Sequence, residues 1–315
     1  MDSRHSTKQL QMSILDGAGR KLNIADHYHQ DNDVTIHQGP CLELMEKMPD
    51  GAADLVVTSP PYNIGKKYEK RIDLDRYIDQ QARVIRECVR LLSDRGSLCW
   101  QVGNYVNQGT IVPLDSVLYP VFAGLGLKMR NRIVWCFEHG LHCSRRFSGR
   151  YEVIMWFTKS DQYWFDLDPV RIPQKYPGKK YFKGEKAGQY SCNPLGKNPG
   201  DVWTIPNVKH NHVEKTEHPC QFPVELVERL VLSMTEPGSL VLDPFLGVGS
   251  SAIAAVRHGR RAAGADIVPE YCQTAIERLR LEERGELKTR PLGQPVYTPG
   301  NEAVARSPFA LGGPE

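Results

Sequence analysis

The sequence SLVLDPFLGVGSSAIAA, residues 239–255, carries the clearest signal for the fold of this chain. It begins with an apolar run typical of a buried strand, turns at Gly247 and Gly249, and continues as a helix from Ser250. Glycines let a ligand approach the backbone closely, and the start of a helix offers N–H groups without intrahelical partners. Asp266 ends the next predicted strand, 19 residues after Gly247, where an acid accepts hydrogen bonds from ribose hydroxyls in nucleotide-binding α/β folds. The pattern favours a nucleoside ligand, with a tight structural turn as the alternative.

A second motif, TSPPY at residues 58–62, follows an apolar run at the end of another predicted strand. Two consecutive prolines remove two amide donors and fix two φ angles, so the carbonyls of Ser59 and Pro60 cannot continue a β-ladder. We expect these carbonyls to point outward, where they can accept hydrogen bonds from an exocyclic amino group. Tyr62 adds a flat ring on which a base can stack. The alternative is a turn that only closes the strand, but the carboxyl end of a strand is where α/β sheets bind ligands.

Hydrophobic periodicity predicts alternating strands and helices over most of the chain. The predicted strands are 34–37, 55–58, 97–102, 132–137, 151–158, 239–242 and 261–265. The predicted helices are 41–48, 77–92, 113–125, 222–236, 250–258 and 269–283. Such alternation predicts an α/β fold with a doubly wound, mostly parallel sheet. The two strands 132–137 and 151–158 have no helix between them, which predicts an antiparallel hairpin at the edge of the sheet.

Composition divides the chain into five segments. Residues 1–32 are polar and aperiodic, and we expect an N-terminal arm. Residues 33–159 and 217–284 carry the two β-α-β runs and form two halves of one domain. Between them, residues 160–216 are rich in Pro, Gly, Lys, Asn and Tyr without a sustained period, which indicates an insertion. Residues 285–315 are rich in Pro and Gly and are expected to form a flexible tail.

The insertion carries a concentration of positive charge. The whole chain has a formal net charge of only +3, yet residues 171–197 hold seven basic residues against one acid, Glu185. Aromatic residues are interleaved with the lysines, a mixture that suits phosphates and unstacked bases. An ordinary solvated face is the alternative. The candidate nucleic-acid contacts are Lys175, Lys179, Lys180, Tyr181, Lys183 and Lys186.

Several other classes of protein fit the sequence poorly. No apolar stretch approaches the length of a membrane span and the first residues lack the apolar block of a secretory signal, so we expect a cytoplasmic protein without a membrane partner. The eight cysteines are scattered without a CxxC pair, and we expect reduced thiols. His210, His212, His218 and Cys220 have a spacing that fits no zinc pattern, so no metal is expected.

Taken together, the motifs resemble the amino-group DNA methyltransferases, which methylate adenine N6 or cytosine N4 with S-adenosyl-L-methionine. Residues 58–62 resemble the catalytic motif of that family, and DPFLGVG at 243–249 resembles its cofactor loop. HPCQFP at 218–223 resembles the segment before the cofactor strand, whose backbone also contacts the cofactor. The motif order resembles the β group, and the similarity spans about residues 33–283, with the basic insertion in place of the target-recognition region.

The resemblance implies a seven-stranded sheet with one antiparallel strand, a base flipped out of double-stranded DNA and direct methyl transfer to its amino nitrogen. It also implies a homodimer, and a cognate restriction endonuclease is a further partner to consider. The implied catalytic residues are Ser59, Pro60, Pro61 and Tyr62. The implied cofactor-binding residues are Gln38, Gly39, Pro40, Cys41, His218, Pro219, Asp243, Pro244, Phe245, Gly247, Gly249, Ser250 and Asp266.

The sequence leaves open the target base, the kind of nucleic acid and other classes of protein. Ser59 favours cytosine N4 in the family pattern, but the Pro60 carbonyl serves either base and the YNIGK sequence that follows also suits adenine. Structured RNA is a second possible substrate. The Pro219-Cys220 pair also fits a cytosine C5 methyltransferase, which uses a cysteine nucleophile, although no partner motif accompanies the pair. The glycine turn with Asp266 also fits a nicotinamide-dependent oxidoreductase, but TSPPY offers no usual proton donor. A DNA-binding module without catalysis would leave TSPPY unexplained.

Overall fold

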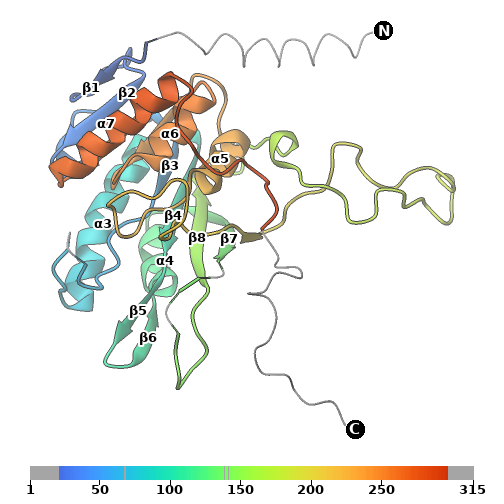
Figure 1. Ribbon diagram of the computed structural model, residues 1–315, viewed down its shortest axis with the longest axis horizontal. Helices are drawn as coiled ribbons and strands as arrows, with labels where there is room; N and C mark the ends of the chain where they lie inside the picture. The colour runs from blue at the N-terminus through green and yellow to red at the C-terminus, as the bar shows by residue number, and fades with distance from the viewer. Residues whose placement is uncertain (1–20, 67–68, 138, 141, 297–315) are drawn as a thin grey trace.

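The structure, a computed structural model, describes residues 21–66, 69–137, 139–140 and 142–296 (Figure 1). Its centre is a nine-stranded sheet with the order β1-β2-β11-β10-β3-β4-β8-β7-β9. The strands of this sheet are β1 (Ile24–Ala25), β2 (Val34–Gln38), β3 (Ala53–Thr58), β4 (Leu92–Val102), β7 (Lys128–Cys136), β8 (Tyr151–Thr158), β9 (Val202–Thr204), β10 (Leu240–Asp243) and β11 (Arg261–Asp266). The helices are α2 (Cys41–Met45), α3 (Leu74–Leu91), α4 (Leu114–Gly124), the 3-10 helix η1 (Asp168–Val170), α5 (Val224–Met234), α6 (Ser250–Arg257) and α7 (Pro269–Glu283).

The predicted fold class is confirmed. In the described part of the sheet, β8 alone runs antiparallel to its neighbours β4 and β7, and every other pairing is parallel. The seven longer strands are those that the sequence predicts, and β8 lies between β4 and β7 because the β7–β8 hairpin folds back into the sheet. The short edge strands β1 and β9 were not predicted. Neither was the separate hairpin of β5 (Asn104–Asn107) and β6 (Thr110–Pro113).

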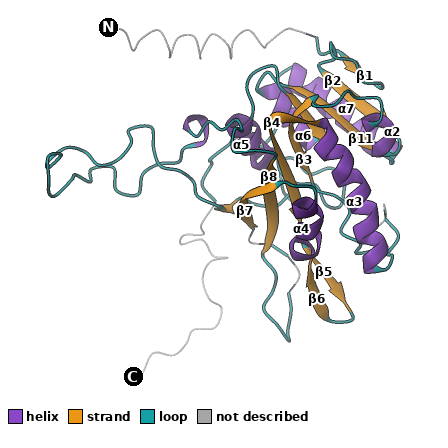
Figure 2. Ribbon diagram, turned by 180° about the vertical axis from the view of Figure 1, so that it is seen from behind, coloured by secondary structure: helices purple, strands orange, loops and turns teal. Residues whose placement is uncertain are grey.

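Helices cover both faces of the sheet (Figure 2). The alternation of side chains along β3 decides which core each residue enters. Leu55 and Val57 belong to the core shared with α5, α6 and α7, whereas Val56 belongs to the core shared with α2, α3 and α4. All three side chains are buried, as expected for a central parallel strand with helices on both sides.

The carboxyl ends of the central strands meet at one edge of the sheet. β10 pairs with β3 on one side and with β11 on the other, so Thr58, Asp243 and Asp266 end strands at this same edge. β8 begins there because it is antiparallel, with Val153 opposite Val102 of β4. Residues from distant parts of the sequence are thereby gathered at the place where α/β sheets bind ligands.

The two ends of the insertion return to the sheet, and the middle extends away from it. Residues 171–197 form an irregular arm with isolated bridges between Ile172 and Lys197 and between Lys180 and Tyr190. Figure 1 shows this yellow-green arm reaching outward past α5. β9 then rejoins the sheet beside β7.

Part of the segment expected to be a flexible tail is instead tied to the domain. Of the stretch 285–315, residues 285–296 are described, and residues 297–315 lie outside the described residues. Arg290 forms an ion pair with the buried Glu225, and the Gly293 amide donates to the same carboxylate at 3.0 Å. A buried carboxylate needs such partners, and α5 offers this one to the returning chain. In the N-terminal segment, residues 1–20 lie outside the described residues, and the rest includes β1.

No helix in the described part of the chain has both the length and the apolar character to cross a bilayer.

Candidate active site

A cavity of about 810 Å³ opens at the carboxyl edge of the sheet, and both sequence motifs contribute to its wall. Thr58 and Asp243, which begin the two motifs, are 185 residues apart in the chain and hydrogen-bonded to each other. The predicted site residues that line the cavity are Gly39, Pro40, Cys41, Ser59, Pro60, Pro61, Tyr62, His218, Pro219, Pro244, Phe245, Gly247, Ser250 and Asp266. The fold therefore brings together residues 58–62, called the proline corner below, and the glycine turn at residues 243–249.

Asp243 fixes the loop at residues 243–249, which resembles the cofactor loop of the family and is given that name below. Its Oδ1 accepts hydrogen bonds from the Thr58 hydroxyl at 2.6 Å and the Phe245 amide at 3.1 Å, and its Oδ2 accepts from the Ser251 hydroxyl at 2.6 Å. The side chain is buried, and burial raises the pKa of Asp243 to about 6. Asp243 is thus positioned to join β3 to β10 and to shape the loop, and it is absent from the cavity lining. The buried Gly249 and the exposed Gln38 also lie outside that lining.

The two glycines of the loop adopt backbone conformations that disfavour other residues. Gly247 has φ 53° and Gly249 has φ 79°, both in the left-handed region. A Cβ on Gly249 would lie 2.9 Å from the Cβ of Ala275, so the loop packs directly on α7. A Cβ on Gly247 would lie 3.4 Å from Nε2 of His218. The sequence motif therefore reflects both turn geometry and close packing.

Asp266 holds the cofactor loop from the next strand. Its Oδ2 accepts the Gly247 amide at 3.0 Å and its Oδ1 accepts the Val268 amide at 2.8 Å. Its backbone carbonyl accepts the Gly39 amide at 2.9 Å, which ties the turn after β2 to the same place. Burial raises the pKa of this carboxyl above its ordinary value. Each carboxylate oxygen has a further lone pair, so Asp266 keeps acceptor capacity at the cavity wall.

The proline corner is clamped from outside the motif. Tyr77 on α3 donates a hydrogen bond to the Pro61 carbonyl at 3.0 Å. Asn63 has φ 60° and exchanges two hydrogen bonds with the Ile72 backbone, at 2.7 and 2.8 Å. Glu69 accepts the Asn63 amide at 2.8 Å. This loop is therefore held in one shape before any ligand arrives.

The Tyr62 hydroxyl belongs to a hydrogen-bond network that the sequence motifs do not predict. It lies 2.9 Å from the Ser59 hydroxyl and donates to Oε2 of Glu152 at 2.9 Å. Nε2 of Gln101 donates to the same oxygen at 2.8 Å. The ring packs on Gly103, where an added Cβ would lie 3.1 Å from Cε2 of Tyr62. Burial raises the pKa of Glu152 and that of Tyr62.

A signal for the missed residues exists in the sequence. Gln101 interrupts the apolar run of β4 near its carboxyl end, and Glu152 precedes the apolar run of β8 at its amino end. The antiparallel pairing places these strand ends together, with Gln101 opposite Ile154. A polar residue beside a buried run at the ligand edge of a sheet therefore marks a candidate site residue.

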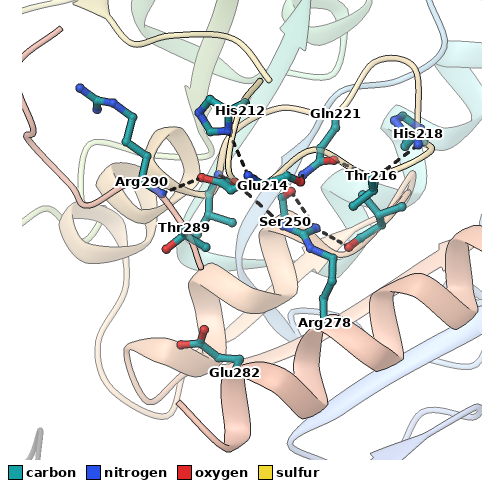
Figure 3. Close-up of polar contacts among 12 residues, drawn as sticks. His212, Glu214, Thr216, His218, Gln221, Ser250, Arg278, Glu282, Thr289 and Arg290 are labelled. Carbon is teal, nitrogen blue, oxygen red and sulfur yellow. Dashed lines mark hydrogen bonds and ion pairs between the residues drawn. The ribbon is translucent and has the colours of Figure 1, made fainter. Parts of the chain in front are cut away.

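The segment before α5 covers the cofactor loop, and a buried polar cluster holds it (Figure 3). His218 lies against Gly247 and stacks edge-on with Tyr271, with ring centroids 4.6 Å apart. Burial, with smaller contributions from Lys215 and Arg278, lowers the pKa of His218 to about 4. The imidazole is therefore neutral at neutral pH.

Glu214 is the centre of that cluster. Its side chain is fully buried, and its two oxygens accept the Val224 amide at 2.9 Å and the Arg290 amide at 3.1 Å. Its backbone carbonyl accepts the side-chain amide of Gln221 at 2.9 Å. Arg278 lies 4.0 Å from the carboxylate. Glu214 thus joins the segment before α5, α5 itself and the C-terminal stretch that includes Arg290.

The predicted nucleic-acid contacts lie on the arm and outside the cavity. Tyr181 is 42 % exposed and its neighbour Phe182 is 90 % exposed. Lys180 and Lys183 lie 5.1 and 6.0 Å from the ring centroids of Tyr190 and Phe182. The arm presents cations and rings together on an open surface.

Comparison with known proteins identifies the family. The model of a family of DNA methylases acting on N6 and N4 matches residues 53–277. This chain belongs to that family. The methylase is 50% identical over 243 residues to the Type II methyltransferase M.BglII of Bacillus subtilis, covering 77% of this chain and 68% of the relative. It is 39% identical over 274 residues to the Type II methyltransferase M.ScaI of Streptomyces caespitosus, covering 83% and 86%.

Two solved structures share the fold of the methylase. The cytosine-N4-specific PvuII DNA methyltransferase aligns with a TM-score of 0.64 at 20% identity, covering 87% of this chain and 98% of that one. The protein TTHA0409 of Thermus thermophilus, solved as a complex with S-adenosyl-L-methionine, aligns with a TM-score of 0.58 at 31% identity, covering 79% and 94%. The methylase is an S-adenosyl-L-methionine-dependent DNA amino-methyltransferase. The alternative interpretations as an oxidoreductase, as a cytosine C5 enzyme and as a non-catalytic module are thereby set aside.

Proposed function

We propose that the methylase modifies cytosine N4 within a short site in double-stranded DNA. The observation that carries this proposal is the Ser59 hydroxyl, which the proline corner holds at the wall of the cavity that the cofactor loop also lines. In the family a serine before Pro-Pro is more often seen with cytosine N4. Adenine N6 is the second candidate, because the DNA adenine methyltransferase YhdJ of Escherichia coli (strain K12) is 30% identical over 271 residues.

The roles proposed for the catalytic residues follow from their placement. A base in a duplex cannot reach the cavity, so it is flipped out at a cost of a few kcal/mol. The Ser59 hydroxyl and the Pro60 carbonyl then accept hydrogen bonds from its amino group, and the Tyr62 ring stacks on it. Because the corner is already clamped by Tyr77 and Asn63, little reorganisation accompanies binding.

The cofactor-binding residues fit S-adenosyl-L-methionine, which supplies an electrophilic methyl group on a sulfonium. Asp266 offers a carboxylate with acceptor capacity for ribose hydroxyls, and Gly247 allows a ligand close approach to the loop backbone. We assign the turn after β2, Gly39–Cys41, to the adenine edge. The neutral ring of His218 covers the loop without placing a second cation beside the sulfonium.

Two surfaces suit the DNA. The arm carries Lys175, Lys179, Lys180, Tyr181, Lys183 and Lys186, which we assign to phosphates and unstacked bases. The loop between β7 and β8 adds Arg145 and Arg146 beside Phe147, whose side chain is fully exposed. This loop leaves the sheet next to Glu152, at the edge where the cavity opens.

The biological setting is proposed from the relatives. M.BglII and M.ScaI are named Type II methyltransferases, which supports a role beside a restriction endonuclease of the same specificity. We also propose that the methylase forms a homodimer, as the resemblance to the β group implies.

Nucleoside mass spectrometry tests the proposal directly. Duplex DNA and total RNA are incubated separately with the methylase and S-adenosyl-L-methionine carrying a labelled methyl group, then digested to nucleosides. We expect label in N4-methyldeoxycytidine from duplex DNA. Label in N6-methyldeoxyadenosine would transfer the assignment to adenine, and label in RNA alone would overturn double-stranded DNA as the substrate.

A further inference from the structure

Three side chains form a continuous hydrogen-bond chain along the cavity wall that ends at the half-buried Glu152. The Ser59 hydroxyl lies 2.9 Å from the Tyr62 hydroxyl, which lies 2.9 Å from Oε2 of Glu152. Nε2 of Gln101 approaches the same oxygen at 2.8 Å. All four residues line the cavity.

The acceptor at the end of this chain fixes the direction of every proton in it. An ionised carboxylate only accepts, so the single proton of the Tyr62 hydroxyl points to Glu152. The Ser59 proton then points to the Tyr62 oxygen, because that oxygen has already donated its own. The remaining lone pairs of the Ser59 oxygen can then accept hydrogen bonds from the amino group of a base bound in the cavity.

We propose that Ser59, Tyr62 and Glu152 form a proton relay that removes the proton released from the target amino group. This inference rests on the proposed function. Glu152 acts through Tyr62 and is a positioning residue, since it sets the direction of the hydrogen bonds and receives the proton at the far end.

Atoms and charge balance in this step. The amino nitrogen forms a bond to the methyl carbon, the carbon–sulfur bond breaks with its electron pair on sulfur, and the nitrogen is left with one proton in excess. Ser59 accepts this proton as it passes its own to Tyr62, and Tyr62 passes its own to Glu152. Both hydroxyls end neutral, and the carboxylate ends as a carboxylic acid that later releases the proton to water.

The surroundings of Glu152 suit this role. Burial raises the pKa of its carboxyl, which makes it a stronger base than an exposed glutamate. Hydrogen bonds from Gln101 and Tyr62 and the field of Lys209 oppose that rise, because each of them stabilises the ionised carboxylate. Gln101 is uncharged and holds the accepting oxygen in place. The site therefore combines an oriented acceptor oxygen with raised basicity.

The test compares single-turnover methylation of duplex DNA by wild type, Glu152→Gln and Tyr62→Phe between pH 5 and 9. We expect a wild-type rate constant that falls toward acid pH, as Glu152 becomes protonated. Both variants should lower it by about a hundredfold and lose the acid limb, with dissociation constants for cofactor and DNA within about twofold of wild type. The double variant should be no slower than either single one.

Tyr77→Phe is the matched control, because it removes a tyrosine hydroxyl bonded to the neighbouring Pro61 carbonyl and should keep the acid limb. Carbon-13 NMR of glutamate-labelled enzyme adds a readout without catalysis. The resonance that Glu152→Gln deletes should titrate above the ordinary glutamate range, and Tyr62→Phe should raise it further. If Glu152→Gln kept both the rate constant of the wild type and its fall toward acid pH, the relay alone would be overturned. Absence of methyl transfer by the wild type would overturn the proposed function as well.

Discussion

Arg278 on α7 donates a hydrogen bond to the Val248 carbonyl, 2.6 Å away, from beneath the cofactor loop. The guanidinium is buried, with Ser250 at 3.4 Å and Glu214 at 4.0 Å. Burial lowers the pKa of Arg278 to about 10, which still leaves it charged at neutral pH. A buried cation therefore lies between this loop and Glu214 of the segment before α5, and it connects the two.

Replacement of Arg278 should therefore affect both cofactor affinity and stability. Arg278→Met removes the donor to Val248 and leaves Glu214 without its nearest cation, at a cost of about 2–4 kcal/mol in the free energy of unfolding. We expect the dissociation constant for S-adenosylhomocysteine to rise about tenfold by calorimetry, a loss of about 1.4 kcal/mol. Arg284→Met is the control, because Arg284 pairs with Glu286 at the surface. This variant should change neither the free energy of unfolding nor the free energy of cofactor binding by more than about 1 kcal/mol. Equal effects of Arg278→Met and Arg284→Met would contradict the role of Arg278 in holding the cofactor loop.

The glycine turn gives a second prediction. Gly249→Ala introduces both a strained left-handed φ of 79° and a contact of 2.9 Å with Ala275. Gly259→Ala introduces only the strain of φ 70°, because nothing lies within 4 Å of its Cβ position. We expect a loss of unfolding free energy of about 1–2 kcal/mol for Gly259→Ala and about 2–4 kcal/mol for Gly249→Ala. Denaturant titration measures both, and only Gly249→Ala should weaken cofactor binding.

Asp243 predicts a pH dependence of stability. Its pKa is about 6 in the folded state and 3.8 as the ordinary value, so the folded state binds the proton more tightly. Stability from this group is complete below about pH 4 and is lost as pH rises through about 6, a change of about 3 kcal/mol. We expect the unfolding free energy of wild type minus that of Asp243→Asn to decrease by this amount over that range.

Asp161→Asn is the control of opposite sign, because Lys128 and Arg130 hold the pKa of the exposed Asp161 below its usual value. Wild type minus Asp161→Asn should increase slightly as pH rises through the ordinary aspartate range. Urea unfolding at a series of pH values measures both differences. A flat difference for Asp243→Asn would mean that Asp243 is ionised as easily in the folded protein as in the unfolded chain.

The sequence predicted the central strands because their signals are local. Apolar runs such as Leu240–Asp243, ended by proline or glycine, carry their own evidence in a few residues. The short strands β1 and β9 carry no such signal, since they exist only because a longer neighbour, β2 or β7, offers an edge. Tertiary contacts determine whether strands of two or three residues form, and hydrophobic periodicity carries no information about those contacts.

The site was predictable where motifs are contiguous and not where it depends on pairing between strands. TSPPY and DPFLGVG place Tyr62 and Gly247 by sequence alone. Glu152 is 90 residues from Tyr62 and has no motif around it, so only the register of β8 against β4 brings it to the site. Asp243 shows a different limit, because it stands within the DPFLGVG motif but its carboxylate accepts a hydrogen bond from Thr58 and is absent from the cavity lining.

Tyr62 and Asp266 should separate catalysis from cofactor binding. Tyr62→Ala removes the proposed stacking ring and interrupts the chain to Glu152, so we expect the single-turnover rate to fall at least about a hundredfold with little change in cofactor affinity. Asp266→Ala removes the acceptor for ribose and for the Gly247 amide, so we expect the cofactor dissociation constant to rise about ten- to a hundredfold. Calorimetry with S-adenosylhomocysteine and single-turnover methylation at saturating cofactor measure the two effects. Equal losses in both assays for both variants would contradict the assignment of Tyr62 to catalysis and of Asp266 to cofactor binding.

The arm should contribute to DNA affinity through two separable terms. Each lysine that neutralises a phosphate contributes about 0.9 to the slope of log affinity against log salt concentration. Lys180→Gln with Lys183→Gln should therefore reduce the steepness of that slope by about 2, measured by fluorescence anisotropy on duplex DNA. Tyr181→Ala should weaken binding by about 1–3 kcal/mol at every salt concentration and leave the slope unchanged, because stacking releases no counterions. Lys47→Gln with Lys288→Gln removes the same charge from exposed positions outside the arm, and its slope should equal that of wild type. If the two lysine pairs reduced the slope equally, the arm would be contributing net charge and no localised contact with the phosphates.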